Sequence, residues 1–405
     1  MLAVQGAPDG SGAVVGRRIA VTGLGVVACC GTGKDAFWAG LLAEPRTGER
    51  RVEDFDPTPL FGPKDVRRVD RFAHFAVAAA DMALADCGGI DNLSADPDRS
   101  GVFIGTGVGG LQTLEDQVVI HHDKGPRRVT PFLVPMIMGN AGAAGVSMRT
   151  GFRGPCETTV TACAAGTHSI GNAARLIATG RCDVMLAGAA EAPMTPVGIT
   201  GFANMTALST TGVSMPFDKK RDGFVITEGA AVVVLEEYSR AQARGAHIYA
   251  ELSGASSTAD AHHITAPSPG GAGAVACMEL ALADAGLRPD DVAYINAHGT
   301  STPLNDAAEA EAINKVFGTP GPAVVSTKGV TGHALGAAGA MEAVAVCLSM
   351  LHRQLPPTGG LTELDPDIHL DLVMGRPRPW EPGPSLSNSF GFGGHNGCLV
   401  FSPAS

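Results

Sequence analysis

Short runs of apolar and β-branched residues alternate with longer alanine-rich stretches along most of the chain. The short runs have the length of buried strands and the alanine-rich stretches have helical length. This alternation predicts an α/β fold in which helices cover the sheets. The segments predicted as strands are Arg18–Thr22, Ser100–Thr106, Asp183–Gly188, Ala230–Glu236, Val292–Ala297, Ala323–Ser326 and Gly397–Ser402.

The first 16 residues are rich in Gly, Ala, Ser and Asp and show no periodicity, which predicts a flexible extension before the first strand. They lack the basic start and apolar centre of a signal peptide. No uninterrupted apolar run reaches the roughly 18 residues that span a bilayer, so we expect no membrane segment. Together these observations favour a cytoplasmic protein.

Two stretches of the chain follow a similar order of elements. Cys163–Ala190 runs from a small-residue turn into a helix and then a strand, and His333–Pro357 runs from a Gly/Ala-rich turn into a long helix. Each follows a strand-like segment. The pattern fits an internal duplication, and it also fits the chance similarity between segments that is found in any α/β protein.

The composition of the chain excludes several classes of function. The 405 residues are 45% apolar, which is enough for a large core, and the net charge of -11 argues against nucleic acid as a general partner. Nine cysteines without a CxxC pair indicate neither a disulfide framework nor a zinc site. Two local basic clusters could meet an acidic partner or form a solvated face: Lys64, Arg67, Arg68 and Arg71, and Lys124, Arg127 and Arg128.

Cys163 is the first candidate for chemistry. It stands where a β-rich run turns through small residues into a helix expected to start near Ala164. The unpaired N–H groups and the dipole of a helix N-terminus favour an anion, so we expect a thiolate with a depressed pKa. A cysteine between a strand and a helix is also a common core residue.

Two histidines lie in glycine- and threonine-rich turns much later in the chain. His298 follows the predicted strand Val292–Ala297, and His333 stands in the glycine-rich segment that begins at Lys328. Such turns at strand ends often carry active-site groups, and the fold can bring distant residues together around a nucleophile. A further glycine-rich segment, Asn388–Asn396, offers a backbone N–H for an oxyanion or forms a plain turn.

Metal and nucleotide sites have weaker support. His262 and His263 are adjacent and have no neighbouring ligand, so we expect no metal. Gly105, Gly107 and Gly110 have the spacing of a dinucleotide fingerprint but lack the acidic residue at the end of the following strand.

The four candidate segments also carry a family resemblance. TACAAG around Cys163, NAHGTSTP around His298, STKGVTGHALGAAGA around Lys328 and His333, and FGFGG at residues 390–394 resemble motifs of the elongating, type II β-ketoacyl-acyl carrier protein synthases. The resemblance runs from VTGLGVV at residue 21 to the final strand and includes GPRRVTPFLVP, PFDKKRDGF and DAAEAEAI.

The resemblance implies a thiolase fold, with two pseudo-duplicated halves in a five-layered αβαβα arrangement and usually a homodimer. We expect the halves at residues 17–250 and 251–405. It also implies that Cys163 receives an acyl group from acyl carrier protein and joins it to malonyl-carrier protein with loss of carbon dioxide. The N–H groups of Cys163 and Phe392 would hold the thioester oxygen, while His298 and His333 would bind the malonyl thioester carbonyl.

Further roles follow from the same resemblance. Lys328 would orient the second histidine, and Phe392 would gate the acyl and malonyl compartments. Expected substrate and carrier contacts are Thr265, Thr300 and Thr302 on the phosphopantetheine arm, Val108, Phe202 and Phe390 around the acyl group, and Lys64, Arg67, Arg68, Arg127 and Arg128 on the carrier protein. No cofactor is expected, apart from a structural monovalent cation near Asn296, Glu342 and Asn388.

The chain departs from the family pattern at several positions. The loop at residues 209–216 is shorter than usual and has Thr211 where an arginine often stands, and Thr227 and His395 replace common Gly and Thr residues. These changes leave open a specialised, inhibitor-tolerant paralogue. A polyketide ketosynthase, which shares the triad, and a non-catalytic chain-length subunit, which typically lacks the cysteine, also stay open. The two histidines argue against a thiolase or an initiating synthase.

Overall fold

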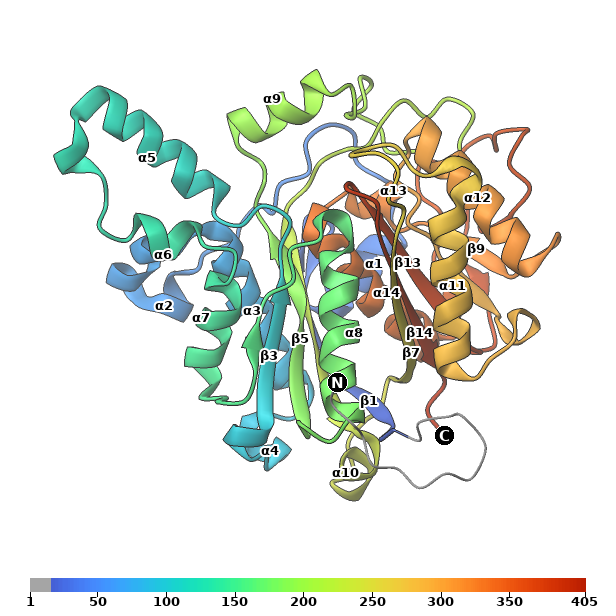
Figure 1. Ribbon diagram of the computed structural model, residues 1–405, viewed down its shortest axis with the longest axis horizontal. Helices are drawn as coiled ribbons and strands as arrows, with labels where there is room; N and C mark the ends of the chain where they lie inside the picture. Colours follow the sequence, from blue (N-terminus) through green and yellow to red (C-terminus); the bar gives the residue numbers. More distant parts are fainter. Residues whose placement is uncertain (1–15) are drawn as a thin grey trace.

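The computed structural model describes residues 16–405 (Figure 1). The predicted flexible extension, residues 1–16, lies outside the described residues except for Gly16. The main sheet has the strand order β11-β9-β8-β13-β14-β7-β1-β6-β5-β3-β4, with β2 beside β1. Its strands are β1 (Ile19–Ala28), β2 (Gly31–Thr32), β3 (Ser100–Gly105), β4 (Cys156–Glu157), β5 (Val184–Glu191), β6 (Gly229–Glu237), β7 (Ala250–Ala259), β8 (Tyr294–Asn296), β9 (Ala323–Val325), β11 (Asp371–Leu372), β13 (Ser385–Gly391) and β14 (His395–Ser402), while β10 (Gln354–Leu355) pairs separately with β12 (Arg378–Pro379).

The strand order contains the same pattern twice. Outward from the centre, the first half runs β1, β6, β5, β3 and β4, with two antiparallel steps followed by two parallel steps. The second half runs β7, β14, β13, β8 and β9 with the same directions in the same order. The two halves meet where β1 pairs with β7. The duplication suggested by the sequence is therefore present in the topology.

Helices form three layers around the two half-sheets. In the first half, α3 and α7 pack on the outer face, and in the second half α11 and α12 do so. Between the half-sheets, α8 and α14 contact strands of both (Figure 1). The α-helices are α1 (Lys34–Leu41), α2 (Thr58–Asp65), α3 (Arg71–Asp86), α4 (Ile90–Leu93), α5 (Leu111–Lys124), α6 (Leu133–Ile137), α7 (Ala141–Thr150), α8 (Ala165–Ala178), α9 (Pro196–Asn204), α10 (Tyr238–Ala243), α11 (Ala272–Ala285), α12 (Pro303–Phe317), α13 (Lys328–Thr331) and α14 (Ala338–His352).

Alternating side chains on the strands explain the layers. On β1, Val26 and Ala28 face the core around the central helices, whereas Val27 faces the core under α3. On β14, Leu399 joins the central core and Val400 the core under α11. Each half-sheet thus buries both faces, as the five-layered arrangement requires.

The central helix α14 corrects the expectation that no segment is apolar enough to span a membrane. Residues Leu335–His352 pass by length and mean hydropathy, but 89% of this stretch is buried inside the protein. It is therefore a core helix, hydrophobic on every side because it packs between two half-sheets.

Each of the seven predicted strands overlaps an observed strand, although the ends differ by up to a few residues. The two-residue strands β2, β4, β10, β11 and β12 were missed, and so were two longer strands, β7 and β13. Both are rich in serine and small residues, so they show little of the β-branched pattern on which the prediction relied. Their position is set by pairing with neighbouring strands on both sides.

The close approach of β1 to α3 gives a stability prediction. A Cβ atom at Gly25 would collide with the backbone of Ala79 and Ala83, whereas one at Gly201 in α9 would meet nothing within 4 Å. We expect Gly25→Ala to lower the free energy of unfolding by about 1–3 kcal/mol. Gly201→Ala should change it by less than about 1 kcal/mol. Denaturant titrations of both variants check this, and equal effects would contradict it.

Candidate active site

Cys163 lies at the start of the central helix α8. A short 3-10 turn, Ala162–Ala164, leads directly into the helix, as the sequence predicted. Ala162 adopts a left-handed conformation with φ of 48°, which turns the chain sharply just before the cysteine. The Cys163 side chain is 6% exposed. The turn therefore holds the thiol inside the protein at a helix N-terminus.

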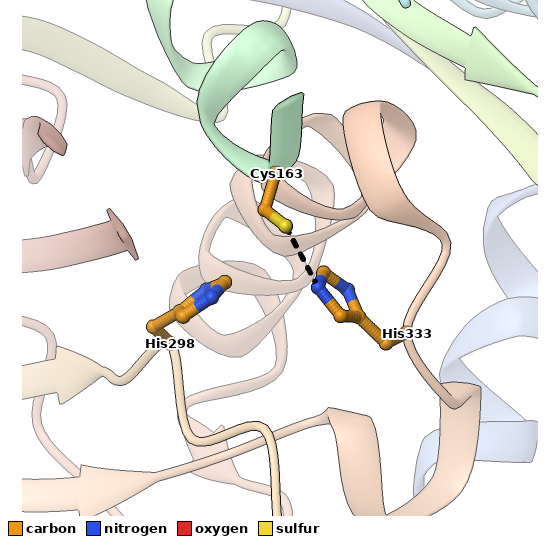
Figure 2. A group of neighbouring side chains, drawn as sticks. All are labelled: Cys163, His298 and His333. Atoms are coloured by element: carbon orange, nitrogen blue, oxygen red, sulfur yellow. Dashed lines mark hydrogen bonds between the residues drawn. The ribbon is translucent and has the colours of Figure 1, made fainter. Parts of the chain in front are cut away.

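His298 and His333 come together on Cys163 from the second half of the fold (Figure 2). His298 follows β8, and His333 lies between α13 and the turn leading into α14. His333 Nε2 is 3.1 Å from Cys163 Sγ, and the two imidazole rings are 5.4 Å apart at an angle of 83°. The three predicted groups thus share one buried site.

The ionisation of Cys163 differs from the expectation. Burial raises the pKa of the Cys163 thiol to about 11, although the Phe392 N–H and the Lys328 charge act in the opposite direction. The predicted depressed pKa of Cys163 is therefore wrong, because removal from water outweighs the helix end. At neutral pH the group is a thiol whose proton can pass to His333 Nε2.

Both histidines are neutral. Burial and the neighbouring Lys328 charge hold the pKa of His298 and that of His333 well below the usual histidine value. Lys328 Nζ lies 3.3 Å from His298 Nδ1 and also donates to the His298 carbonyl oxygen at 2.5 Å. Because the ammonium can only donate, Nδ1 accepts, and the remaining proton of His298 is on Nε2.

The position of Lys328 corrects a predicted role. The family resemblance implied that Lys328 orients the second histidine, but its side chain contacts His298, the first one. Its ammonium also pairs with the buried carboxylate of Glu342 on α14. The reason is geometric, since Lys328 begins α13 beside the loop that follows β8, whereas His333 lies beyond the other end of α13.

Glu309 is a site residue that the sequence pattern did not single out. Its carboxylate accepts the backbone N–H groups of His298 and Gly299 at 2.8 and 2.7 Å. Burial raises the pKa of Glu309 to about 7. The sequence did contain a signal for Glu309. It stands in the segment EAEAI of α12 among alanines and an isoleucine, and a carboxylate that is buried with such residues needs hydrogen-bond partners.

The glycine-rich segment Asn388–Asn396 is a hairpin and not only a turn. Residues 385–391 form β13, residues 395–402 form β14, and Phe392 stands between them. The backbone N–H groups of Phe392 and Cys163 both face the Cys163 sulfur. A Cβ at Gly391 would lie 3.0 Å from the Thr161 oxygen and 3.1 Å from the Cys163 nitrogen, so a larger residue would displace the hairpin from the cysteine by a few tenths of an ångström.

A cavity of about 530 Å³ reaches the three catalytic candidates. Thr300 and Thr302, whose hydroxyls are 2.9 Å apart, line it together with Thr265, Phe390 and Phe392. Val108 and Phe202 lie outside its lining. Val108 is 45% exposed, while Phe202 packs edge-on against Phe224, which in turn touches the His333 ring.

The shortened loop lies at the mouth of this cavity. The carboxylate of Asp222 accepts hydrogen bonds from the side chain of Ser209, from the backbone and side chain of Thr210, and from the backbone of Thr211. Thr211, which stands at the usual arginine position, is thus tied into the loop. His395 packs under Gly393 in the hairpin that carries Phe392.

The two basic clusters lie near one another on the surface. Lys64, Arg67, Arg68, Arg127 and Arg128 are all exposed. The Arg68 guanidinium stacks 4.9 Å from the centre of the Phe132 ring. This contact connects the segment after α2, which carries most of the first cluster, with the segment before α6, which follows the second. Arg71 differs from the others, because its Nε and Nη2 both donate to the buried carboxylate of Glu228.

Ion and nucleotide sites can be judged from the same contacts. Asn388 Oδ1 and Glu342 Oε2 are buried without a partner, as is Asn296 Nδ2, so two free oxygens fit the implied cation. Ligand atoms of Cys163, His298 and His333 lie within 4.8 Å of one another, close enough for a metal. Glu191 accepts the N–H groups of Gly107 and Val108, which leaves them unable to bind a phosphate.

The raised pKa of Cys163 can be tested by alkylation of its thiol. Because only the thiolate reacts, alkylation of Cys163 by iodoacetamide should accelerate about tenfold per pH unit from pH 7 to 10. Peptide mass spectrometry of Cys163 at each pH gives the rate. A plateau below pH 9 would show that the helix end outweighs burial after all.

Comparisons with known proteins agree with this site. Residues 16–241 match the family model "Beta-ketoacyl synthase, N-terminal domain", and residues 249–362 match "Beta-ketoacyl synthase, C-terminal domain". Proteins named 3-oxoacyl-acyl-carrier-protein synthase 2 are 45% identical in Synechocystis sp. and 44% in Rhizobium meliloti. Both comparisons cover 95% of this chain and 98% of the relative.

Solved structures show the same fold. A ketosynthase/chain length factor for ishigamide superposes with a TM-score of 0.91 at 33% identity, covering 96% of this chain and all of that one. A β-ketoacyl synthase from Burkholderia phymatum gives 0.90 at 34% identity with the same coverage. Two matching domain models, near-complete alignments and the buried Cys-His-His site lead to one conclusion: this chain belongs to the β-ketoacyl synthase family, with its thiolase fold.

Proposed function

We propose that this chain is an elongating 3-oxoacyl-acyl carrier protein synthase, which adds two carbons to an acyl group in fatty acid synthesis. The contact of Cys163 with His333 beside His298 carries the proposal, because it joins a nucleophile, a proton acceptor and a second donor in one buried site. Its relatives of 44–45% identity have the name of this activity.

The first step is acyl transfer. Cys163 Sγ attacks the thioester carbonyl of an acyl-carrier protein, and His333 Nε2 takes the thiol proton and passes it to the leaving carrier thiol. The N–H groups of Cys163 and Phe392 face the sulfur, where they stabilise the oxygen that gains negative charge. The acyl group is then bound to the enzyme as a thioester.

The second step is decarboxylative condensation. Once Cys163 is acylated, no thiol proton faces His333 Nε2, so the neutral ring can have its own proton on this atom. Malonyl-carrier protein loses carbon dioxide, and the resulting enolate oxygen accepts hydrogen bonds from His298 and His333. Lys328 holds His298 with its proton on Nε2, so this atom can donate to the oxygen. The enolate carbon attacks the acyl carbonyl on Cys163, the carbon–sulfur bond breaks, and the released Cys163 thiolate takes up a proton from water.

Acyl carrier protein is the expected partner. One structural neighbour, which has a TM-score of 0.87 at 33% identity, is a polyketide ketosynthase in complex with its acyl-carrier protein. In this chain the exposed cations Lys64, Arg67, Arg68, Arg127 and Arg128 would meet an acidic carrier, and Thr265, Thr300 and Thr302 would line the path of its phosphopantetheine arm. No other organic cofactor is required.

We also infer a cytoplasmic homodimer. The edge strand β4 (Cys156–Glu157) has a partner on one side only, and the segment 108–160 exposes many large apolar side chains: Val108, Leu114, Val118, Val119, Phe132, Val134, Met138, Met148 and Val160. A patch of this kind is typical of a subunit interface. Val108 and Phe202 would border an acyl pocket completed there.

A monovalent cation would have a structural role beside the site. The free oxygens of Glu342 and Asn388 would hold it, and it would balance the buried carboxylate on the side away from Lys328.

A polyketide ketosynthase is the second candidate, because two of the structural neighbours are a ketosynthase/chain length factor and a polyketide ketosynthase. Their 33% identity is lower than the 42–45% of the relatives named 3-oxoacyl-acyl-carrier-protein synthase 2. The presence of Cys163, both histidines and Lys328 argues against a non-catalytic subunit. Product analysis separates the two pathways, since a polyketide enzyme extends its product repeatedly without reduction.

Turnover of a graded series of acyl-carrier proteins with malonyl-carrier protein tests the mechanism. We expect the wild type to gain an acyl mass on Cys163 and to release a product two carbons longer, and Cys163→Ala to do neither. His298→Ala should keep the acyl adduct but lose about 100-fold or more in condensation, as for a removed oxyanion donor. Intact mass spectrometry reads both steps. A wild type that forms no acyl-enzyme with any primer would overturn the proposal.

The dimer is tested by sedimentation velocity. Val134 on α6 is 60% exposed in the single chain, and Leu280 on the outer helix α11 is 52% exposed. We expect Val134→Asp to shift the protein to monomers, because it places a charge in the interface, while Leu280→Asp stays dimeric. A monomeric wild type, or a dimeric Val134→Asp, would contradict the assignment.

A further inference from the structure

The buried cation Arg50 lies behind the catalytic site and takes no part in the steps described above. Its side chain is 2% exposed. Nη1 donates to the carbonyl oxygens of Gly329 at 3.0 Å and Val330 at 2.7 Å, with a longer contact of 3.4 Å to that of Lys328. Nη2 donates to the Arg46 carbonyl oxygen at 2.8 Å. Within residues 16–405 no carboxylate forms an ion pair with Arg50.

Three of these four carbonyl groups belong to α13 (Lys328–Thr331). The last carbonyl groups of a helix have no donor within it, and an arginine side chain can supply one. A guanidinium removed from water also needs partners, and here the carbonyl oxygens are those partners. Arg50 and α13 therefore hold each other in place. Without Arg50, the carbonyl groups of Gly329 and Val330 lose this donor and the helix becomes free to shift.

Thr227 fastens the backbone of Arg50 to the first half of the fold. Arg50 and Thr227 pair in a short parallel bridge, and the Thr227 hydroxyl donates to the Arg50 carbonyl oxygen. This hydroxyl exists because Thr227 stands where related chains commonly have glycine. The backbone of His333 is held separately, since its N–H donates to the Val225 carbonyl at 2.7 Å and its carbonyl accepts the Thr227 N–H at 3.2 Å.

We propose that Arg50 is a positioning residue for condensation, because through the carbonyl groups of α13 it holds Lys328 where the ammonium binds His298. This inference rests on the proposed function. The contact of Lys328 with His298 Nδ1 keeps the imidazole proton on Nε2, which donates to the enolate oxygen. Acyl transfer instead uses Cys163 and His333, whose backbone does not depend on Arg50. Loss of Arg50 therefore slows the second step far more than the first.

Measuring the two steps separately tests this selectivity. Acylation is followed by intact mass spectrometry after mixing with acyl-carrier protein, and condensation by product release from isolated acyl-enzyme at saturating malonyl-carrier protein. We expect Arg50→Met to slow condensation about tenfold or more, as small misplacements of catalytic groups do, and to change acylation less than about threefold. Arg50→Lys, which keeps the charge and one donor, should recover part of the rate. Equal losses in both steps, or normal condensation in folded Arg50→Met, would refute the proposal.

Arg240 on α10 is the matched control. Its Nη2 also donates to backbone carbonyl oxygens, those of Leu93 and Ser94, and its Nε lacks a partner like that of Arg50. α10 lies at the bottom of the view in Figure 1 and α13 near its top. We expect Arg240→Met to lower the free energy of unfolding without changing either rate. A selective loss of condensation in Arg240→Met would show that lower stability alone explains the effect.

Thr227 provides a milder test that keeps Arg50 in place. Thr227→Val has the same shape but cannot donate to the Arg50 carbonyl oxygen, so we expect a smaller loss, again confined to condensation. Thr227→Ser restores the hydroxyl and should restore the rate. This pair decides the question if Arg50→Met does not fold. Condensation as fast in Thr227→Val as in the wild type would then count against the proposal.

Amide hydrogen exchange tests the hold on α13 without any substrate. The N–H groups of Val330, Thr331 and Gly332 make hydrogen bonds within α13 and at its end. We expect these amides to exchange at least about tenfold faster in Arg50→Met than in the wild type, and at the wild-type rate in Arg240→Met. Unchanged exchange in Arg50→Met would refute the hold on the helix. A wild type that forms no product would instead refute the proposed function, while the exchange rates still decide on Arg50.

Discussion

The structure depends on the close contact between the two central helices at their N-terminal ends. A Cβ at Gly166 on α8 would lie 2.7 Å from the Ala340 nitrogen on α14, and one at Gly339 would collide with the Thr167 hydroxyl. Glycine at both positions lets the helices meet backbone to backbone. Because Cys163 precedes one helix and His333 the other, this contact sets the distance between nucleophile and imidazole.

Around that contact, the electrostatics of the site come from one buried cation. Lys328 pairs with Glu342, holds His298 and keeps both imidazoles neutral through its charge. Removal from water is the larger effect on the pKa of Cys163, of both histidines and of Glu309 and Glu342. The thiol and the two imidazoles are therefore neutral beside the Lys328 charge, and hydrogen bonds orient His298 and His333, so little rearrangement is needed when negative charge forms on a substrate.

Much of the fold and the chemical groups could be predicted from the sequence. Local patterns were sufficient for the elbow at Cys163, for seven strands and for the histidine turns, since each depends on residues close together in the chain. They failed for β7 and β13, whose serine-rich segments are strands because of their neighbours in the sheet. They also failed for the partner of Lys328 and the pKa of Cys163, because both depend on burial and on groups far away in sequence. Glu309 was missed for the same reason.

The duplicated topology has a consequence for when activity arises during synthesis and folding of the chain. The first half supplies the thiol, but the second supplies both imidazoles and, through the hairpin between β13 and β14, the Phe392 N–H. β14 is added last and lies between β13 and β7. In a nascent chain the nucleophile is therefore made well before the imidazoles and the Phe392 N–H that act with it. Condensing activity arises in a single event when β14 completes the second half, and the growing polypeptide is catalytically silent until then.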